Sequence, residues 1–318
     1  MKRFSPVFFE QSVALTASGR RRPQKVVIYQ NEQCPIFNYF ATLRAPTTRT
    51  TMARALYAVA HHLGQASIYD IEWQKFSHTK LAVLINRLDA AGLSPHTVRL
   101  YVCAVKQVAK QAYFLGLMSD KQYLQLSDVS ASGGSRVRDY TLLDKSQTDH
   151  LLREIAEKNS IHAFKLRDTA IFSVLLGCGL RRAEVVGLRR DCVTRTHIKV
   201  IGKGNKERTI ALHPSVSTAL AQWIAALPDE APWVFTRIRR NGLISSLPLS
   251  DSMIFKLTRK YATVPPHSLR RSFATRLYQA GANINDLARI LGHSKTATTE
   301  IYVLSSQQRQ DDTILTYY

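Results

Sequence analysis

In the first half of the chain, apolar residues recur three and four positions apart. This spacing predicts amphipathic helices over Thr47–Leu63 and Ser77–Ala91. A third helix is expected over Pro95–Leu115, because Ser94 followed by proline forms the N-cap and first-turn pair that starts helices. We therefore predict a small helical bundle within residues 34–126.

The second half combines helical patterns with one strand pattern. Phe164–Cys178 is nearly all apolar, which is typical of a buried helix. His197–Ile201 and Glu207–Leu212 flank a Gly-Lys-Gly-Asn turn and predict a β-hairpin. The other helices are predicted over Asp144–Lys158, Pro214–Leu227, Asp251–Ala262, Ser268–Ala280, Ile284–Leu291 and Ala297–Tyr302. The expected fold class is mainly α with a small β-hairpin.

A short polar segment separates the two halves. Ser127–Ser135 is rich in serine and glycine, the composition of a flexible linker. The chain is therefore expected to comprise a basic leader (1–33), a helical domain (34–126), a linker (127–140), a second domain (141–304) and a C-terminal tail (305–318). Within the leader, a possible strand covers Val26–Tyr29.

The chain of 318 residues is strongly basic. It carries 44 Lys and Arg against 23 Asp and Glu, a formal net charge of +21. The excess is spread over both halves, with net +6 in residues 34–126 and net +11 in residues 141–318. A hydrophobic content of 45% is enough for folded cores, which excludes a disordered basic tail. We expect a polyanionic partner, with nucleic acid the first candidate.

Membrane insertion, secretion and a disulfide framework are not expected. The longest nearly apolar run, Ala170–Leu180, is too short to span a bilayer. The N-terminus lacks the sustained apolar run of a signal peptide. The four cysteines are isolated and show no C-x-x-C spacing, so no zinc site is expected and a reducing compartment fits best.

Five short motifs in the second half carry residues suited to phosphate chemistry. In order they are G-L-R-R-A-E (179–184), G-K-G-N-K-E-R (202–208), H-S-L-R (267–270), L-G-H (291–293) and T-E-I-Y (299–302). Arginine and lysine can clamp a phosphate, and histidine can donate a hydrogen bond or transfer a proton. A tyrosine hydroxyl can attack phosphorus where cations or a base activate it. No acidic cluster suited to Mg²⁺ accompanies the motifs, so the arginines would take the place of metal ions.

Each of these residues alone has an ordinary structural explanation. Arg181 could interact with the C-terminal dipole of the preceding helix, and Lys203 could be a solvated hairpin tip. His267 could be a helix-start residue and His293 a capping residue. Tyr302 on an amphipathic helix is more often part of a core than a nucleophile. Only the presence of all these residues in one order favours a catalytic site over these separate structural roles.

That ordered set resembles the tyrosine recombinase (phage integrase) family over about residues 144–302. The family's G-L-R-x-x-E, G-K-G-x-K-x-R, H-x-L-R and L-G-H motifs are present in order, with a tyrosine nine residues after the last histidine. The matched site residues are Arg181, Glu184, Lys203, His267, Arg270, His293 and Tyr302. Tyr317 and Tyr318 lie outside the motif spacing and are discounted as nucleophiles.

The resemblance implies a site-specific DNA recombinase that works through a 3′-phosphotyrosine and a Holliday junction, without metal or other cofactor. It makes Tyr302 the nucleophile and Lys203 the general acid for the leaving 5′-oxygen. Arg181, Arg270 and His293 are implied to contact the non-bridging phosphate oxygens. His267 is implied to assist proton transfer or orient the phosphate, and Glu184 to hold Arg181 in place.

The resemblance also implies an architecture and partners. The helical bundle would bind core DNA and the α+β catalytic domain would face it, together forming a C-shaped clamp on a double-stranded recombination site. A homotetramer would act on two sites, with accessory DNA-bending proteins as possible partners, and the tail would dock on a neighbouring protomer. The location expected is the bacterial cytoplasm, in association with the nucleoid and not with a membrane.

Some DNA contacts and two alternative functions stay open. Arg99, Lys106 and Lys110 on the third helix are candidate DNA contacts, with simple surface solvation as the alternative. Arg271 stands where the family often has a second histidine, and either contacts DNA or is a surface charge. The alternative functions are a type IB topoisomerase, which relaxes DNA without a specific site, and a non-enzymatic DNA-binding regulator.

Overall fold

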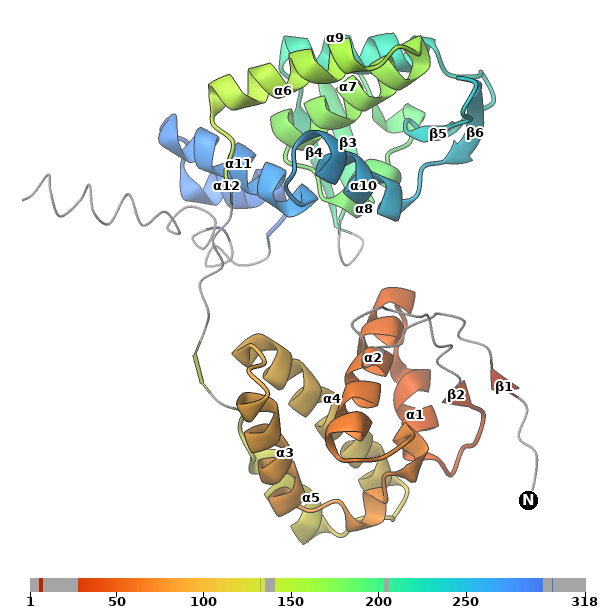
Figure 1. Cartoon of the computed structure of the whole chain (residues 1–318), viewed down its shortest axis with the longest axis vertical. Coiled ribbons are helices and arrows are strands. Elements are labelled where there is room, and N and C mark those ends of the chain that lie inside the picture. The colour runs from red at the N-terminus through yellow and green to blue at the C-terminus, as the bar shows by residue number, and fades with distance from the viewer. Residues whose placement is uncertain are drawn as a thin grey trace, which may run out of the picture. The chain divides into compact units, whose positions relative to one another are not determined.

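The computed structural model describes residues 6–7, 28–131, 133–134, 141–202, 206–293 and 299. The chain divides into two compact units, Met1–Val137 and Arg138–Tyr318 (Figure 1). Each unit has its own hydrophobic core. The predicted clamp concerns the relation between the units and stays a prediction.

The described part of the first unit is a bundle of helices around α4. The helices are α1 (Pro35–Thr42), α2 (Pro46–His62), α3 (His78–Ala90), α4 (Pro95–Phe114) and α5 (Asp120–Asp128), with short 3₁₀ helices at Ile68–Asp70 and Trp73–Lys75. Strands β1 (Pro6–Val7) and β2 (Ile28–Tyr29) pair antiparallel. Because α4 contacts α1, α2, α3 and α5, it forms the centre of the bundle.

Local sequence explains where these helices begin. Ser77, Ser94 and Ser119 each accept a hydrogen bond from the backbone N–H three residues later, at the starts of α3, α4 and α5. The three helices predicted here are confirmed as α2, α3 and α4. The short helices α1 and α5 were not predicted, and α5 continues through Asp128, two residues into the predicted linker.

The second unit is mainly helical and carries two small hairpins. Its helices are α6 (Lys145–Lys158), α7 (His162–Gly177), α8 (Arg182–Val186), α9 (Pro214–Ala225), α10 (Asp251–Tyr261), α11 (Pro266–Gln279) and α12 (Ile284–Leu291), with a 3₁₀ helix at Arg190–Cys192. Its strands are β3 (His197–Ile201), β4 (Glu207–Ala211), β5 (Thr236–Ile238) and β6 (Ile244–Pro248). The predicted mainly-α fold class is therefore confirmed.

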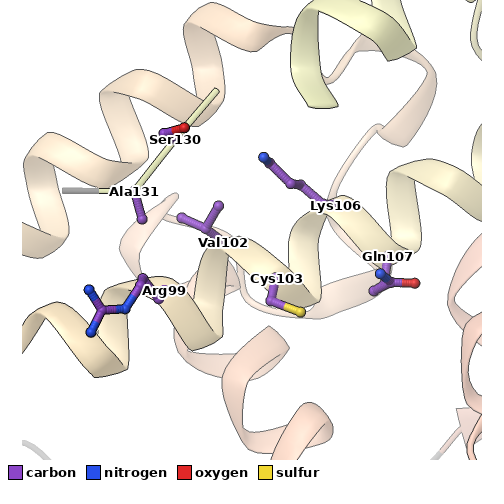
Figure 2. Close-up of a pocket in the computed structure, with 7 residues that line it drawn as sticks. All are labelled: Arg99, Val102, Cys103, Lys106, Gln107, Ser130 and Ala131. Carbon is purple, nitrogen blue, oxygen red and sulfur yellow. The ribbon is translucent and has the colours of Figure 1, made fainter. Parts of the chain in front are cut away.

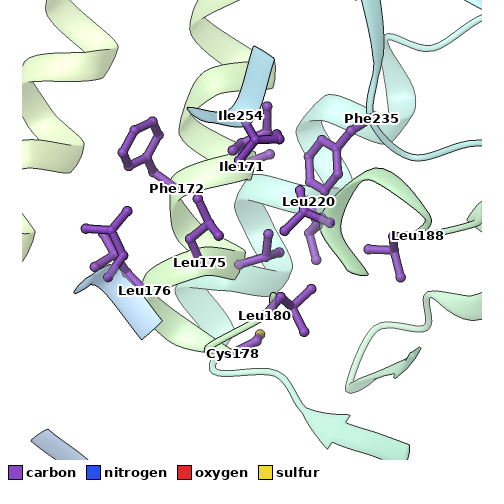
Figure 3. Close-up of a cluster of buried hydrophobic side chains, with 14 of the residues drawn as sticks. Ile171, Phe172, Leu175, Leu176, Cys178, Leu180, Leu188, Leu220, Phe235 and Ile254 are labelled. Carbon is purple, nitrogen blue, oxygen red and sulfur yellow. The ribbon is translucent and has the colours of Figure 1, made fainter. Parts of the chain in front are cut away.

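Helix α7 lies at the centre of this unit and packs against α6, α9 and α11 (Figure 1). Its apolar residues are buried together with side chains of α9 and α10, including Leu220 and Ile254 (Figure 3). Full burial of one Leu or Phe side chain stabilises a fold by about 1.5–3 kcal/mol. The buried core thus fixes the C-terminal end of α7, from which the first motif begins.

The sequence predicted only one of the two hairpins. Strands β3 and β4 pair as predicted, with Val200 opposite Arg208 and Ile201 opposite Glu207. Strands β5 and β6 were not predicted, although Asn241-Gly242 between them is a turn signal and Gly242 has φ +87°. None of the helices in the described ranges has the length and apolar content that crossing a bilayer requires.

Candidate active site

The first motif begins where the buried helix α7 ends. Gly179 has φ +60°, and a Cβ at this position would lie 2.4 Å from Cδ1 of Phe273, so only glycine fits the turn. Arg181 follows as the N-cap residue of α8, with 33% of its side chain exposed. Its Nη2 donates to the carbonyl of Gly292 at 3.2 Å. The turn therefore brings an exposed guanidinium to the end of α12.

Glu184 on α8 is the acidic centre of the site, with 3% of its side chain exposed. Arg181 donates to it from the backbone N–H at 2.8 Å and from Nη1 at 2.9 Å. Burial alone would raise the pKa of Glu184, but hydrogen bonds and charges from Arg208 and Arg181 lower it to about 2. Glu184 is therefore a carboxylate at neutral pH.

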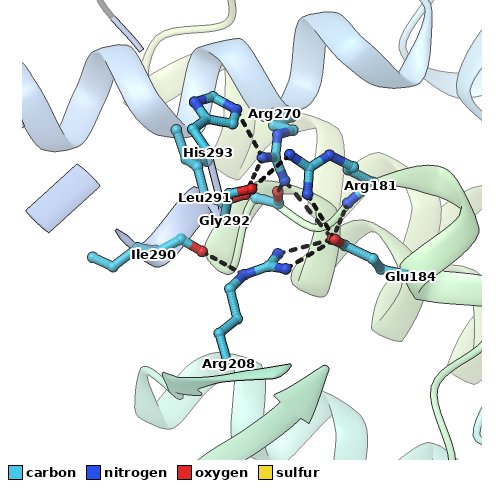
Figure 4. Close-up of polar contacts among 9 residues, drawn as sticks. Arg181, Glu184, Arg208, Arg270, Ile290, Leu291, Gly292 and His293 are labelled. Carbon is cyan, nitrogen blue, oxygen red and sulfur yellow. Dashed lines mark hydrogen bonds and ion pairs between the residues drawn. The ribbon is translucent and has the colours of Figure 1, made fainter. Parts of the chain in front are cut away.

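Arg208 on β4 belongs to the same group, although sequence analysis assigned it no role. Its Nη1 and Nη2 donate to Oε1 and Oε2 of Glu184 at 2.9 and 2.8 Å, a bidentate pair (Figure 4). Its Nε donates to the carbonyl of Ile290 at 2.7 Å. The residue closes the G-K-G-N-K-E-R motif, and that position was the signal that could have identified it.

Arg270 on α11 lies in the interior of the group, with 1% of its side chain exposed. Its Nη1 donates to the carbonyl of Gly179 at 2.6 Å, and its Nη2 donates to the carbonyl of Leu291. Its Nη1 also lies 3.8 Å from Oε2 of Glu184. Backbone carbonyls from the turn after α7 and from the last residue of α12 thus hold this guanidinium in one orientation.

His293 follows α12, which ends at Gly292 in the left-handed conformation (φ +64°). Its Nε2 lies 3.1 Å from Nη2 of Arg270, and its Nδ1 lies 2.8 Å from Oγ1 of Thr299. Because a guanidinium can only donate, Nε2 accepts, and the ring proton therefore resides on Nδ1. Loss of solvent and the charges of Arg270 and Arg181 lower the pKa of His293 to about 4, so the ring is neutral at neutral pH.

His267 stands at the start of α11 and keeps an exposed surface. Partial burial of the ring, followed by the charges of Arg271, Arg270 and Arg181, lowers the pKa of His267 to about 4. Like His293, it can accept a proton when an anion offsets the surrounding positive charge.

The structure thus brings together five of the seven predicted site residues, from segments far apart in the sequence. One group, joined by hydrogen bonds and ion pairs, contains Arg181, Glu184, Arg270 and His293. The positive charges of Arg181 and Arg270 also act on His267 and lower its pKa. Lys203 and Tyr302 lie outside the described residues. Thr299, the hydrogen-bond partner of His293, precedes Tyr302 by three positions in the sequence.

The charge of this group suits an anion. Three guanidiniums, those of Arg181, Arg208 and Arg270, surround the single carboxylate of Glu184 within 4 Å. Cations in excess of their counter-charge attract phosphate, and arginine can bind two of its oxygens at once. Across the described ranges, no group of three or more His, Cys, Asp or Glu side chains could hold a metal ion.

The candidate DNA contacts of the first unit lie on α4, where Arg99 and Lys106 line a surface hollow of about 430 Å³ (Figure 2). Arg99 donates from Nη1 to the carbonyl of Gly134 at 3.0 Å, and Lys106 donates from Nζ to the carbonyl of Ser127 at 2.7 Å. Lys110 is exposed, with its Nζ 5.5 Å from the ring centre of Phe114. Two of the three cations therefore hold the end of α5 and the segment after it on α4.

Arg271 requires a correction. The alternative favoured from sequence was a surface charge, but the residue is buried with 4% exposure. It lies on α11 next to Arg270, where nine of the ten positions from Pro266 to Thr275 are buried and only His267 is exposed. The surface assignment is therefore wrong, and the contact with DNA stays a prediction.

Comparison with known proteins adds to this geometry. A sequence profile described as the phage integrase family matches residues 141–309. The tyrosine recombinase XerC of Shewanella amazonensis is 31% identical over 280 residues, which cover 83% of this chain and 88% of that protein.

Two solved structures share the fold. The XerH site-specific recombinase, in a post-cleavage complex with a palindromic difH substrate, aligns with TM-score 0.67 and 19% identity over 85% of this chain and 80% of that one. A lambda integrase tetramer bound to a Holliday junction aligns with TM-score 0.62 and 15% identity over 85% of this chain and 76% of that one.

Proposed function

The chain belongs to the phage integrase family of tyrosine-type site-specific recombinases, and from this premise we propose that it exchanges DNA strands through a 3′-phosphotyrosine on Tyr302. The tyrosine oxygen attacks phosphorus while the bond to the 5′-oxygen breaks, which leaves a free 5′-hydroxyl. That hydroxyl then attacks the phosphotyrosine of the partner duplex and releases the tyrosine. Each step exchanges one phosphoester for another, and two rounds pass through a Holliday junction.

In this proposal the two motif arginines bind the non-bridging oxygens of the scissile phosphate. Arg181 is the more accessible, since a third of its side chain is exposed. Arg270 is buried and oriented by two backbone carbonyls, so its remaining hydrogen-bonding capacity is fixed before substrate arrives. Such preorganised donors stabilise the charge that develops on the phosphate oxygens in the transition state.

His293 adds a donor to the same phosphate. Without DNA, its Nε2 accepts from Arg270 and the ring is neutral. A phosphate beside Arg270 brings negative charge, which raises the pKa of His293 and favours protonation of Nε2. The protonated ring can then donate to a non-bridging oxygen, while Thr299 holds it through Nδ1.

Lys203 is the proposed general acid. The leaving 5′-oxygen must gain a proton as its bond to phosphorus breaks, and an ammonium on a flexible stem can supply it. In the sequence this lysine lies between strands β3 and β4. Arg208 on β4 donates a hydrogen bond to Glu184 and so connects the hairpin to the group of charges. His267, with its lowered pKa, is a further group that can exchange protons beside the arginines.

The observation that carries this proposal is that Arg181 and Arg270 meet at the carboxylate of Glu184, with His293 hydrogen-bonded to Arg270. These three residues come from segments more than 20 residues apart, and the three guanidiniums at Glu184, which include Arg208, carry more positive charge than its one carboxylate balances. A purely structural network gains nothing from such an excess, because uncompensated buried charge is costly. A bound phosphate would balance it.

The proposed partners follow from the reaction. Two specific double-stranded sites and four protomers are needed for reciprocal exchange, and the lambda integrase neighbour was solved as a tetramer on a Holliday junction. We include accessory DNA-bending proteins as partners that could bring the sites together. The net charge of +21 suits residence on chromosomal DNA in the cytoplasm.

The experiment begins with a DNA site recovered by selection from random-sequence duplexes. A nick placed beside the scissile phosphate lets the 5′-hydroxyl fragment diffuse away, so that any covalent adduct accumulates. The wild-type protein should form the adduct. Tyr302→Phe should bind the same duplex with unchanged affinity and form none, because phenylalanine lacks the attacking oxygen.

The matched control is the double variant Tyr317→Phe, Tyr318→Phe, which should still form the adduct. An adduct with Tyr302→Phe, or its loss in the control, would contradict the assignment of the nucleophile. Relaxation of supercoiled plasmids that lack the selected site would support the type IB topoisomerase alternative. Specific binding without any adduct would support the regulator.

A further inference from the structure

We propose that Arg208 is a positioning residue that fixes the turn carrying Lys203 against the group of charges that binds the scissile phosphate. The inference rests on the proposed role of Lys203 as general acid. It concerns how the β3–β4 hairpin holds the general acid at a fixed position relative to the phosphate.

Arg208 connects three separate parts of the second unit. From β4, its two terminal nitrogens reach both carboxylate oxygens of Glu184 on α8, and its Nε reaches the carbonyl of Ile290 near the end of α12 (Figure 4). Three directed hydrogen bonds from one planar group fix its orientation as well as its distance. Any movement of the hairpin relative to α8 or α12 must break at least one of them.

Two motif glycines leave the space that this guanidinium occupies. A Cβ on Gly202 would lie 3.3 Å from both Nη1 of Arg208 and Oε1 of Glu184. A Cβ on Gly292 would lie 3.0 Å from Nη1 of Arg208. The first glycine precedes Lys203 and the second precedes His293, so Arg208 packs against the backbone of two motif loops at once.

The contacts act at the base of the turn. Arg208 pairs with Val200 in the hairpin register, and the N–H of Gly202 donates to the carbonyl of Lys206 at 2.7 Å. These bonds fix the residue directly before Lys203 and the residue that closes the turn. The hydrogen bonds between Arg208 and Glu184 therefore hold Gly202, the residue before Lys203, at a fixed position relative to Glu184.

Direct binding of phosphate by Arg208 fits the geometry less well. Its Nε, Nη1 and Nη2 each already donate to an oxygen of the protein, and two of these bonds pair it with both carboxylate oxygens of Glu184. The structure therefore assigns it to holding other groups in place.

Substrates with different leaving groups distinguish a variant that misplaces the general acid from a variant that damages the site as a whole. If sulfur replaces the 5′-bridging oxygen of the scissile phosphate, the leaving group is a thiolate, which departs without a proton. Loss of the general acid then no longer slows cleavage. A variant that only misplaces the acid should recover on the sulfur substrate, whereas one that damages the arginine site should stay slow on both.

The test compares adduct formation on the oxygen and sulfur substrates for the wild type, Lys203→Ala, Arg208→Lys and Arg208→Gln. Lysine keeps the charge of Arg208 but cannot make two parallel bonds to Glu184. Because a displacement of about 1 Å can cost roughly 10²-fold in rate, we expect both Arg208 variants to cleave the oxygen substrate about 10- to 100-fold more slowly. On the sulfur substrate they should return to within about threefold of wild type.

The matched control is Lys199→Gln, which removes a positive charge from the same hairpin at an exposed ion pair with Glu207. It should leave the ratio of the two cleavage rates unchanged, since exposed pairs contribute little. If the Arg208 variants stay slow on sulfur while Lys203→Ala recovers, the inference is wrong and the proposed function stands. If Lys203→Ala also stays slow on sulfur, the general-acid role fails and the inference fails with it.

Gly202→Ala provides a second route if the Arg208 variants do not fold. The added methyl group presses on Arg208 and Glu184 without removing any charge. It should slow cleavage of the oxygen substrate and recover on sulfur, as expected for Arg208→Lys. Thermal melting and DNA affinity, measured alongside, should remain close to wild type, and an equal rate loss on both substrates would contradict the inference.

Discussion

Two groups of buried charges in the second unit differ in how they are balanced. On α7, Arg167 and Asp168 pair one to one at 2.7 Å, and the Tyr261 hydroxyl donates to the second oxygen of Asp168 at 3.1 Å. At the motif site, Glu184 faces three arginines. A balanced pair needs nothing from outside the protein, whereas a group with surplus cations is complete only when an anion joins it.

The comparison predicts opposite effects of mutation. Breaking the balanced pair should reduce stability and spare the chemistry of the molecules that remain folded. Removing a surplus cation should spare stability and slow the chemistry. Both groups lie in one folded unit, so a single preparation of each variant can report both quantities.

The largest effect is expected for Asp168→Asn, which leaves the Arg167 charge buried without its counter-charge. Removing one partner of a buried pair typically costs about 3–5 kcal/mol, so the free energy of unfolding measured with urea should fall by that amount. The cleavage rate per folded molecule should not change. The double variant Arg167→Met, Asp168→Leu should recover most of the stability, and a lasting loss of cleavage in it would place this pair in the active site.

The next effect is expected for Arg181→Gln. Loss of one positioned donor to the phosphate should lower the rate of adduct formation about 10²–10³-fold. The matched control is Arg182→Gln, whose guanidinium forms an exposed ion pair with Asp251 at 2.7 Å. Its rate should stay near wild type, and both variants should melt near the wild-type temperature. Equal rates for the two variants would remove Arg181 from the site.

The smallest effect is expected from acid. Because the pKa of Glu184 is lowered to about 2 in the folded chain, the stability it contributes is present above pH 4.5 and is lost as the pH falls towards 2. A shift of this size corresponds to about 3 kcal/mol. Urea unfolding across this pH range should show the loss in wild type and a flatter profile in Glu184→Gln. An unchanged profile in Glu184→Gln would contradict the arrangement, with Glu207→Gln as the control.

The sequence pattern predicted the longer elements well. Helices α2, α3, α4 and α7 and the β3–β4 hairpin were found, because their periodic faces extend over several turns or alternate across a clear turn. The short helices α1, α5 and α8 were missed, whereas α12, also of eight residues, was found because Leu287 and Leu291 lie four positions apart on one face. Helices of two or three turns owe most of their stability to tertiary packing, which leaves a weak local pattern.

The site was predictable to the extent that it is encoded by ordered motifs. Motif spacing identified Arg181, Glu184, Arg270 and His293, which the structure brings together. It did not distinguish buried from exposed arginines, because their burial depends on partners from distant segments. Arg208 was overlooked and Arg271 was misassigned to the surface for this reason.

In the proposed reaction, the surplus cations hold a phosphate for attack by one particular tyrosine. The most direct test is to trap the adduct of the wild-type protein on the nicked site, digest protein and DNA, and identify the nucleotide-bearing peptide by mass spectrometry. The account predicts a nucleotide attached through its 3′-phosphate to Tyr302. A nucleotide on Tyr317, Tyr318 or any other residue would contradict it.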